Sequence, residues 1–221
     1  MDTLPTTLNA DRRLAALVHG AQAPWLRSPE PGVERRLLER VGGEVALATS
    51  IVRYAPGSRF AAHVHELGEE FLVLEGVFSD EHGDHPAGSY ARNPPGSRHA
   101  PYSEGGCVIF VKLRQMARDD RDAVRLMGPR AEARLLHEAG NLVVRLEALP
   151  PGGRLPLGGA TGAQEVFVVE GSAMLHEEGR ATPLERWSWL RWPQHGAVHI
   201  EAGGDGALLW TARGHLPPAR R

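Results

Sequence analysis

An internal repeat with a constant offset of 95 positions constrains the fold of this 221-residue chain more than any other feature. FLVLEG at 71–76 returns as VFVVEG at 166–171, and PGS at 56–58 returns as PGG at 151–153. Solenoid proteins repeat units of about 20–50 residues, so a longer period indicates two copies of a whole domain. We therefore predict two domains of similar fold in tandem.

Runs of branched and apolar residues, bounded by Gly, Pro, Asn or Asp, predict short β-strands. The first copy contains EVALATSIVRYA, FLVLEGVF and CVIFVKL, each of which has this composition. Turn sequences recur between the runs at the spacing typical of an antiparallel sandwich or barrel. We therefore predict an all-β fold that consists of two barrels.

Two segments depart from this β pattern. Residues 10–19, ADRRLAALVH, predict a short helix, and the Pro-rich stretch that follows them predicts an extended arm. The charged segment 114–133 contains a Gly-Pro pair and predicts a linker. We therefore divide the chain into an N-terminal arm with the first barrel, residues 1–128, and a second barrel, residues 129–221.

The charge balance excludes several classes of partner. The chain has 25 basic and 27 acidic residues, a formal net charge of -2, so it lacks the basic surplus of a protein that binds nucleic acid or an anionic membrane. The single cysteine, Cys107, excludes an internal disulfide, and the N-terminal sequence lacks the apolar run of a signal peptide. We expect a soluble, cytoplasmic protein.

Four side chains of the first copy have the spacing of a metal site: His63, His65, Glu69 and His99. Residues two apart on a strand share a face, so His63 and His65 point the same way, and Glu69 returns to that face after a turn. His99 follows the turn NPPGS, from which an adjacent antiparallel strand brings it level with the others. An isolated His-x-His pair often arises by chance, but the added carboxylate and distant histidine favour metal binding. This set of donors suits zinc, iron, manganese, nickel or copper rather than calcium.

The segments that carry these residues, PGSRFAAHVHELGEEFLVLEG and RNPPGSRH, resemble the two motifs of the cupin superfamily. More narrowly, residues 33–117 resemble the cupin-like domain of ChrR, a zinc-binding anti-sigma factor of the singlet-oxygen response. The resemblance implies double-stranded β-helix (jelly-roll) barrels and a metal held by three His and one Glu. The implied ligands are His63, His65, Glu69 and His99. Glu70 occupies a position that other cupins use, but the ChrR-like spacing and the strand parity favour Glu69.

The chain departs from ChrR-type regulators before the barrel. Those regulators carry an N-terminal helical domain whose HxxxCxxC zinc motif belongs to the part that grips the sigma factor. Here His19 is the only histidine before the barrel and Cys107 is the only cysteine of the chain. We therefore do not expect direct binding of a sigma factor.

The second copy lacks the ligands of the first. The offset of 95 places Gly158, Ala160 and Gln164 at the positions of the first three ligands, and none of them replaces the lost donors. His195 and His199 stand near the place of the fourth ligand, but late histidines without partners are more typical of a surface or a core. We therefore predict a second barrel without a metal.

Several other residues are weaker candidates, because aromatic and charged side chains in a small barrel more often belong to the core. The aromatic residues predicted to line an apolar pocket are Phe60, Phe71, Tyr102 and Phe110. The side chains predicted to meet an anionic or oxygenated ligand are Arg53, Tyr54 and Arg92. We place His82 and His85 on a solvated turn and Cys107 in the interior. The stripe formed by Trp187, Trp189 and Trp192 favours core packing, with an interface as the alternative.

Two functions fit the sequence best. The first is a metal-binding regulator or sensor, with zinc as the metal and a small molecule as a further ligand. The second is a metal-dependent dioxygenase that acts on a small diketone or an aromatic ketone. A third interpretation is an assembly unit whose metal is vestigial. Because cupins commonly pair through sheet edges, we also expect a homodimer.

Overall fold

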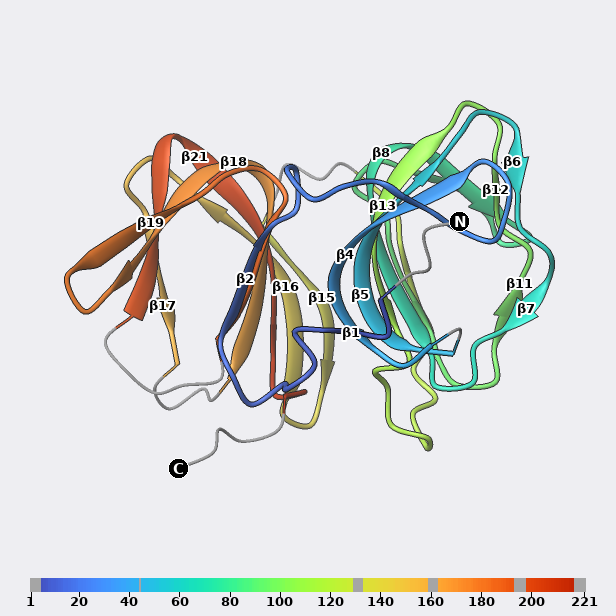
Figure 1. The fold of residues 1–221 in the computed structure, drawn as a ribbon, viewed down its shortest axis with the longest axis horizontal. Coiled ribbons are helices and arrows are strands. Elements are labelled where there is room, and N and C mark those ends of the chain that lie inside the picture. The colour runs from blue at the N-terminus through green and yellow to red at the C-terminus, as the bar shows by residue number, and fades with distance from the viewer. Residues whose placement is uncertain (1–4, 44, 129–132, 159–162, 193–197, 217–221) are drawn as a thin grey trace. The chain divides into compact units, whose positions relative to one another are not determined.

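The computed structural model describes residues 5–43, 45–128, 133–158, 163–192 and 198–216, and this part of the chain contains β-strands and no helix. Figure 1 colours the strands by their place in the chain, from blue near the N-terminus to red near the C-terminus. They form antiparallel sheets, which confirms the predicted all-β fold of two tandem barrels. The described residues include no helix with the length and apolar character needed to cross a membrane.

The chain divides into two compact units. The first unit comprises Met1–Ala10 and Pro24–Arg130, and the second comprises Asp11–Ala23 and Ala131–Arg221. The strands of the first unit are β1 (Thr7–Leu8), β3 (Leu26–Arg27), β4 (Val33–Val41), β5 (Leu47–Tyr54), β6 (Ser58–Arg59), β7 (His63–Val64), β8 (Glu69–Asp80), β9 (Gly83–Pro86), β10 (Tyr90–Asn93), β11 (Arg98–His99), β12 (Tyr102–Ser103), β13 (Cys107–Leu113) and β14 (Val124–Leu126). The strands of the second unit are β2 (Ala16–His19), β15 (Arg134–Ala139), β16 (Leu142–Leu149), β17 (Arg154–Leu157), β18 (Gln164–Glu177), β19 (Arg180–Leu184), β20 (Ser188–Trp192) and β21 (Val198–Arg213).

The first unit is organised around the long strand β8. One half of β8 pairs with β10 and β13 in a sheet of order β1-β4-β5-β13-β8-β10-β14. Its other half pairs with β9 and β12, and β12 also pairs with β6. β7 and β11 form a separate two-stranded ladder. Because β8 belongs to both halves of the sheet, residues from both halves meet in one apolar interior.

The interior of the first unit follows the period of two that a strand imposes on its side chains. Val52 and Tyr54 of β5 belong to the same buried cluster as Cys107, Ile109 and Val111 of β13. The intervening residues of β13 are buried as well, which explains its continuous apolar sequence.

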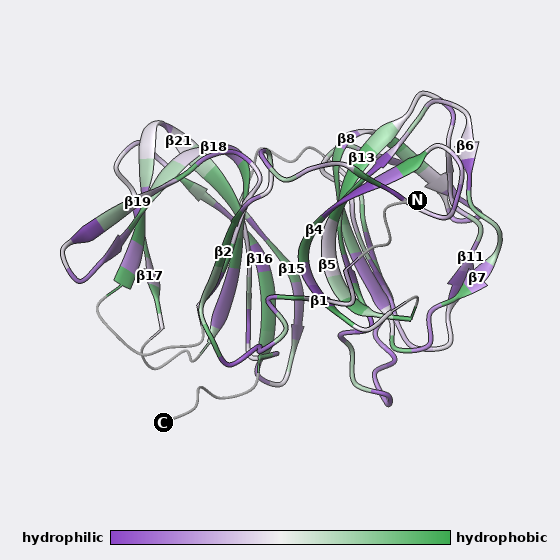
Figure 2. Cartoon of the chain, viewed as in Figure 1, coloured by the Kyte–Doolittle hydropathy of each residue, from purple (hydrophilic) through white to green (hydrophobic). Residues whose placement is uncertain are grey.

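The second unit has the corresponding arrangement. Its sheet has the order β15-β16-β21-β18-β20-β2. In addition, β17 pairs with the first residues of β21, and β19 pairs with the last residues of β18. Alternate residues of these strands form its buried apolar cluster. Figure 2 shows the green of apolar residues recurring along the strands of each unit.

A pair of glycines gives the repeat a physical basis. Gly76 and Gly171 lie 95 positions apart, and both have positive φ, 70° and 75°. A Cβ atom at either position would collide with a backbone carbonyl oxygen, that of Gly106 in the first unit and that of Gly206 in the second. Each barrel therefore requires glycine where β8 or β18 crosses close to its neighbour.

The structure corrects three predictions about organisation. The helix predicted at 10–19 is wrong, because β2 pairs with β20 in an antiparallel ladder. The linker predicted at 114–133 contains β14, which pairs with β10. The division at 128/129 lies close to the observed one, but the predicted arm is divided, because Asp11–Ala23 belongs to the second unit.

Candidate metal centre

The structure brings the four predicted ligands together inside the first unit. His63 of β7 and His99 of β11 are directly opposite each other in their ladder, and Glu69 begins β8. One potential ligand atom from each of the four side chains lies within 4.8 Å of one from every other. His65, Glu69 and His99 are buried, whereas His63 is half-buried. Figure 2 draws β11, which consists of Arg98 and His99, in the purple of hydrophilic residues.

Each imidazole is oriented through its Nδ1 atom. The Nδ1 of His63 lies 3.0 Å from the carbonyl oxygen of Ala61, and that of His65 lies 3.0 Å from the Ser97 hydroxyl. The Nδ1 of His99 lies 3.1 Å from a carboxylate oxygen of Asp80. An imidazole with Nδ1 held in this way directs Nε2 to the centre of the cluster, which is the arrangement of a histidine ligand.

Two of these Nε2 atoms show that the residues fit a metal ion. The Nε2 atoms of His65 and His99 are buried and have no hydrogen-bond partner in the structure. They lie 3.6 Å and 3.4 Å from the same oxygen of Glu69, Oε1. A buried polar atom without a partner is costly, and a cation placed between the two nitrogens and the carboxylate would satisfy all three.

The electrostatics of His65 agree with this role. Burial is the largest influence on its imidazole and lowers the pKa from 6.5 to about 4, although the nearby Glu69 raises it. His99 and His63 lower it further. His65 is therefore neutral at physiological pH, and neutral imidazole is the form that binds metals.

Strand parity separates Glu69 from Glu70. The Oε1 atom of Glu69 accepts a hydrogen bond of 3.0 Å from the Asn93 amide, and Arg125 in turn donates to Asn93. Glu70 accepts a hydrogen bond of 2.8 Å from the Tyr90 hydroxyl instead. The structure thus places Glu69 in the cluster and directs Glu70 away from it.

Asp80 is a candidate functional residue that the sequence did not reveal. Its side chain is fully buried, and it accepts hydrogen bonds from the His82 backbone amide and pairs with the imidazoles of His85 and His99. Burial alone would raise the pKa of Asp80, but the contacts with His85 and His99 outweigh it and hold that pKa well below its usual value. Asp80 therefore remains ionised, and its contact with the Nδ1 atom fixes the orientation of the His99 imidazole.

The prediction for the hairpin between β8 and β9 is half right. His82 is exposed, as expected for a solvated turn, but His85 is 2% exposed and pairs with Asp80 at 3.2 Å. Position in a turn sequence predicted exposure for both, since the pairing of β9 with β8 cannot be read from local composition.

Aromatic rings lie beside the cluster. The ring of Phe60 is 5.7 Å from that of His63, and the ring of Phe78 is 5.9 Å from that of His99. Tyr54 lies 5.9 Å from Phe60 and 5.6 Å from Phe78. Of the residues predicted to line a pocket, Phe60 therefore approaches the site most directly, and Tyr54, which was predicted to meet a ligand, packs against Phe60 and Phe78.

The other predicted lining residues have partners elsewhere. Phe71 packs in the core against Phe78 and His85, Phe110 is buried, and Tyr102 lies beneath the guanidinium of Arg59. The two predicted arginines also have partners: Arg53 forms an ion pair with Glu34, and Arg92 forms one with Asp120. Neither arginine contacts the four-residue cluster in these interactions.

Cys107 and the tryptophan stripe belong to the interior. Cys107 is 4% exposed, and burial raises its pKa to about 11, which leaves the thiol unreactive. Trp187, Trp189 and Trp192 are buried, and the Trp189 indole donates a hydrogen bond of 3.0 Å to Glu165. These features favour core packing over the interface alternative.

The second unit replaces the polar centre with apolar residues. Phe78 is opposite His85 in the first unit, and Ala173, one repeat later, is opposite Leu184. Leu184 therefore takes the position of His85.

The same register places the two remaining positions. Leu175 lies 95 positions after Asp80. In the first unit Ser79 is opposite Tyr102, and in the second unit Met174, which lies 95 positions after Ser79, is opposite Glu201. Glu201 therefore takes the position of Tyr102, and Val198, three residues before Glu201, takes the position of His99. Leu175, Leu184 and Val198 all belong to the buried apolar cluster.

The predicted equivalents of the ligands in the second copy are only partly described. Gly158 and Gln164 are described and supply neither an imidazole nor a carboxylate, whereas Ala160 and His195 lie outside the described residues. His199 is described, but it does not take the position of His99. It lies on the other face of β21, opposite His176.

Comparison with known proteins places the chain among cupin-fold proteins. Residues 14–117 match the family model described as the ChrR cupin-like domain. No curated protein sequence matches the chain.

Solved structures resemble the chain over most of its length. A bacterial pirin from Escherichia coli, YhhW, in complex with nickel(II), is 16% identical, with a TM-score of 0.69 over 93% of this chain and 100% of that one. A proposed dioxygenase from Nostoc punctiforme is 14% identical, with a TM-score of 0.68 over 95% and 88%. An oxalate decarboxylase from Lactobacillus farciminis is 11% identical, with a TM-score of 0.57 over 92% and 87%. At these identities the likeness establishes the fold.

Proposed function

We propose that this cupin-fold protein, which contains a ChrR-like cupin domain at residues 14–117, binds one divalent transition metal ion in its first barrel. The proposed ligands are His63, His65, Glu69 and His99. The observation that carries the proposal is the pair of buried Nε2 atoms, of His65 and His99, that share a carboxylate oxygen and have no hydrogen-bond partner. A bound ion would act as a Lewis acid toward an oxygen-containing ligand.

Zinc is the metal we propose, with iron, manganese and nickel as alternatives. Three imidazoles and one carboxylate match the nitrogen and oxygen donors of zinc, and four protein ligands complete a tetrahedral site. The nickel in the pirin structure shows that a related fold accommodates another metal of this series. Metal availability as well as ligand type decides among them.

We propose a regulatory or sensing role for this centre. The match to the ChrR cupin-like domain supports this role. His63 is half-buried and adjoins Phe60, so the edge of the cluster offers an apolar contact to a small ligand or an oxidant. The homodimer and the cytoplasmic location stay predictions from the sequence.

Elemental analysis of the purified protein tests metal binding. After dialysis against a weak chelator, chosen to remove any ion held by three protein ligands or fewer, the full chain should retain about one equivalent of metal. The His63→Ala/His65→Ala variant should then retain almost none, because two of its four ligands are gone. A matched His19→Ala variant should retain the metal, since His19 lies in the second unit beside Ser188. A full equivalent of metal in the double variant would refute the assignment.

A dioxygenase is the second candidate function. It is favoured by the likeness to the proposed dioxygenase and by the aromatic side chains beside His63 and His99. X-ray absorption of the metal as isolated separates the two functions: closed tetrahedral zinc supports sensing, and iron with exchangeable waters supports oxygenation. Oxygen uptake by the iron-loaded protein with a small diketone would establish the second.

A further inference from the structure

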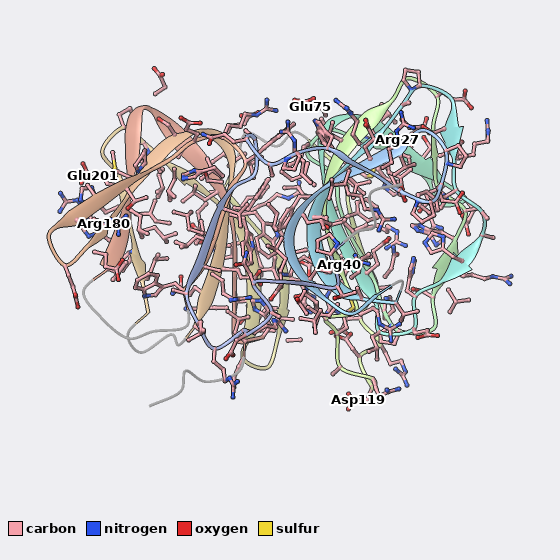
Figure 3. All side chains as sticks on the ribbon, in the orientation of Figure 1. Arg27, Arg40, Glu75, Asp119, Arg180 and Glu201 are labelled. Carbon is pink, nitrogen blue, oxygen red and sulfur yellow. The ribbon has the colours of Figure 1, made fainter. Side chains whose placement is uncertain are left out.

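The second unit carries a cluster of metal-binding side chains on the outer face of its sheet. His176 lies on β18, and His199 and Glu201 lie on β21. Their neighbours Leu175 and Ile200 point into the buried apolar cluster, so the period of two directs these three side chains outward. Glu201 is labelled in Figure 3.

The strand register brings the two histidines together. His176 and His199 are directly opposite each other in the ladder of β18 and β21. Their rings are stacked, with centroids 4.7 Å apart and planes inclined by 7°. Glu201 follows His199 by two residues and therefore shares its face, and one potential ligand atom from each of the three residues lies within 4.8 Å of the others.

An atom in this cluster lacks a partner. The Nε2 of His199 is buried and has no hydrogen bond in the structure, although the residue as a whole is only half-buried. A buried imidazole nitrogen without a hydrogen bond is costly unless a cation or another group satisfies it. The stacked His176 ring and the Glu201 carboxylate are the neighbouring groups able to share such a cation.

We propose that His176, His199 and Glu201 form a second divalent transition-metal site. Two imidazole nitrogens and one carboxylate oxygen suit zinc, nickel, cobalt or copper, whereas calcium and magnesium require more oxygen ligands. Three protein ligands leave a coordination position for water or an external donor. The site thus differs from the four-ligand centre of the first barrel.

An arginine modulates this site. The Nε atom of Arg154 donates a hydrogen bond of 2.7 Å to Oε2 of Glu201, which leaves Oε1 available to a metal. The Arg154 side chain is 65% exposed, and exposed ion pairs of this kind are weak in water. Arg154 therefore weakens metal binding without preventing it.

The inference goes beyond the proposed function and is independent of it. The internal repeat relates His176 to Glu81 rather than to a proposed ligand, and the cluster faces away from the barrel interior. Loss of the first centre therefore leaves the second intact, and the two are separable by mutation.

Calorimetric titration of metal-free full-length protein with Zn²⁺ tests the proposal. Wild type should bind two equivalents, His176→Ala/His199→Ala should bind one, and His63→Ala/His65→Ala should retain the equivalent bound at β18 and β21. Glu177→Gln is the matched control and should bind two, because Glu177 adjoins His176 but is not part of the cluster. Removal of the competing ion pair in Arg154→Ala should tighten the second site about two- to fivefold.

Two results would overturn the assignment: a single equivalent in wild type with the first centre occupied, or two equivalents in His176→Ala/His199→Ala. If that double variant does not fold, Glu201→Gln provides the test. It keeps the shape of the side chain and should weaken only the second binding event. Equal denaturation midpoints for the metal-free proteins verify that folding is unchanged.

Discussion

The two barrels share a backbone plan but differ in what fills the interior. Both require a glycine with positive φ at the same position of the repeat, Gly76 and Gly171, and both pair their long strands in the same order. In the first barrel the interior holds the four-residue cluster and the buried carboxylate of Asp80. In the second barrel Leu175 takes the place of that carboxylate and packs among apolar side chains.

This difference indicates that the proposed metal centre includes supporting residues as well as its ligands. Among the described residues of the second barrel, Gly158 and Gln164 supply no ligand, and the positions of Asp80 and His85 hold Leu175 and Leu184. A buried carboxylate is tolerated where imidazoles satisfy it, and an aliphatic side chain is more stable where they do not. The supporting residues and the ligands are therefore present together or absent together.

The largest expected effect tests the shared backbone. Gly76→Ala and Gly171→Ala should each destabilise the metal-free protein by about 3 kcal/mol, because the new Cβ meets a carbonyl oxygen and the residue keeps positive φ. Gly57→Ala and Gly152→Ala are matched controls, since their φ is also positive but no atom lies within 4 Å of the added Cβ. Each control should cost about 1 kcal/mol. Denaturant unfolding measures all four, and a cost at Gly171 no larger than at Gly152 would contradict the shared close approach.

The next effect concerns pH and distinguishes the polar interior from the apolar one. The folded-state pKa of His65 is about 4, below its usual 6.5, so between these values the unfolded chain binds a proton that the folded chain does not. The free energy of unfolding of the metal-free protein should therefore be highest above pH 6.5. It should fall by about 2 kcal/mol as the pH is lowered toward 4, with solvent screening taken into account.

Denaturation of His65→Leu across the same pH range is the control for this prediction. Leucine does not titrate, so the variant should lose most of the pH dependence between 6.5 and 4. An unchanged slope would show that other groups cause it.

The smallest expected effect is on metal affinity, when a residue of the first barrel is replaced by the residue that the second barrel has at the same position. Asp80→Leu removes the partner of the His99 Nδ1 atom and should weaken metal binding by about tenfold or more. Competition with a chelating dye measures the affinity. Asp80→Asn retains an oxygen acceptor and should lose less. Equal affinities for Asp80→Leu and wild type would show that His99 needs no anchor.

The four proposed ligands were predictable because each stands in a recognisable sequence motif. The spacing of His63, His65 and Glu69 follows from strand parity and one turn, and the position of His99 follows from a Pro-Gly turn. The resemblance to cupins added the barrel. Parity also separated Glu69 from Glu70, whose side chain the structure directs to Tyr90.

The missed residues depend on how strands pair rather than on local composition. Asp80 and His85 belong to the pairing of β8 with β9, and His176 meets His199 across β18 and β21. The offset between the repeats grows from 95 to 99 positions between Asp80 and His99, so a constant offset of 95 leads from His99 to position 194, beside His195, rather than to Val198. The helix prediction at 10–19 failed for a similar reason, since the pairing of β2 with β20 overrides local propensity.

The position of β2 has a consequence for synthesis of the chain. His19 of β2 lies opposite Ser188 of β20, 169 positions later. During translation β2 emerges from the ribosome long before β20 exists, so it must wait unpaired until Ser188–Trp192 has been made. Closing so long a loop is slow, and we expect the docking of β2 to be among the last events of folding. Fragments cut at residue 128 would separate β2 from β20, so neither fragment would contain all strands of the second barrel.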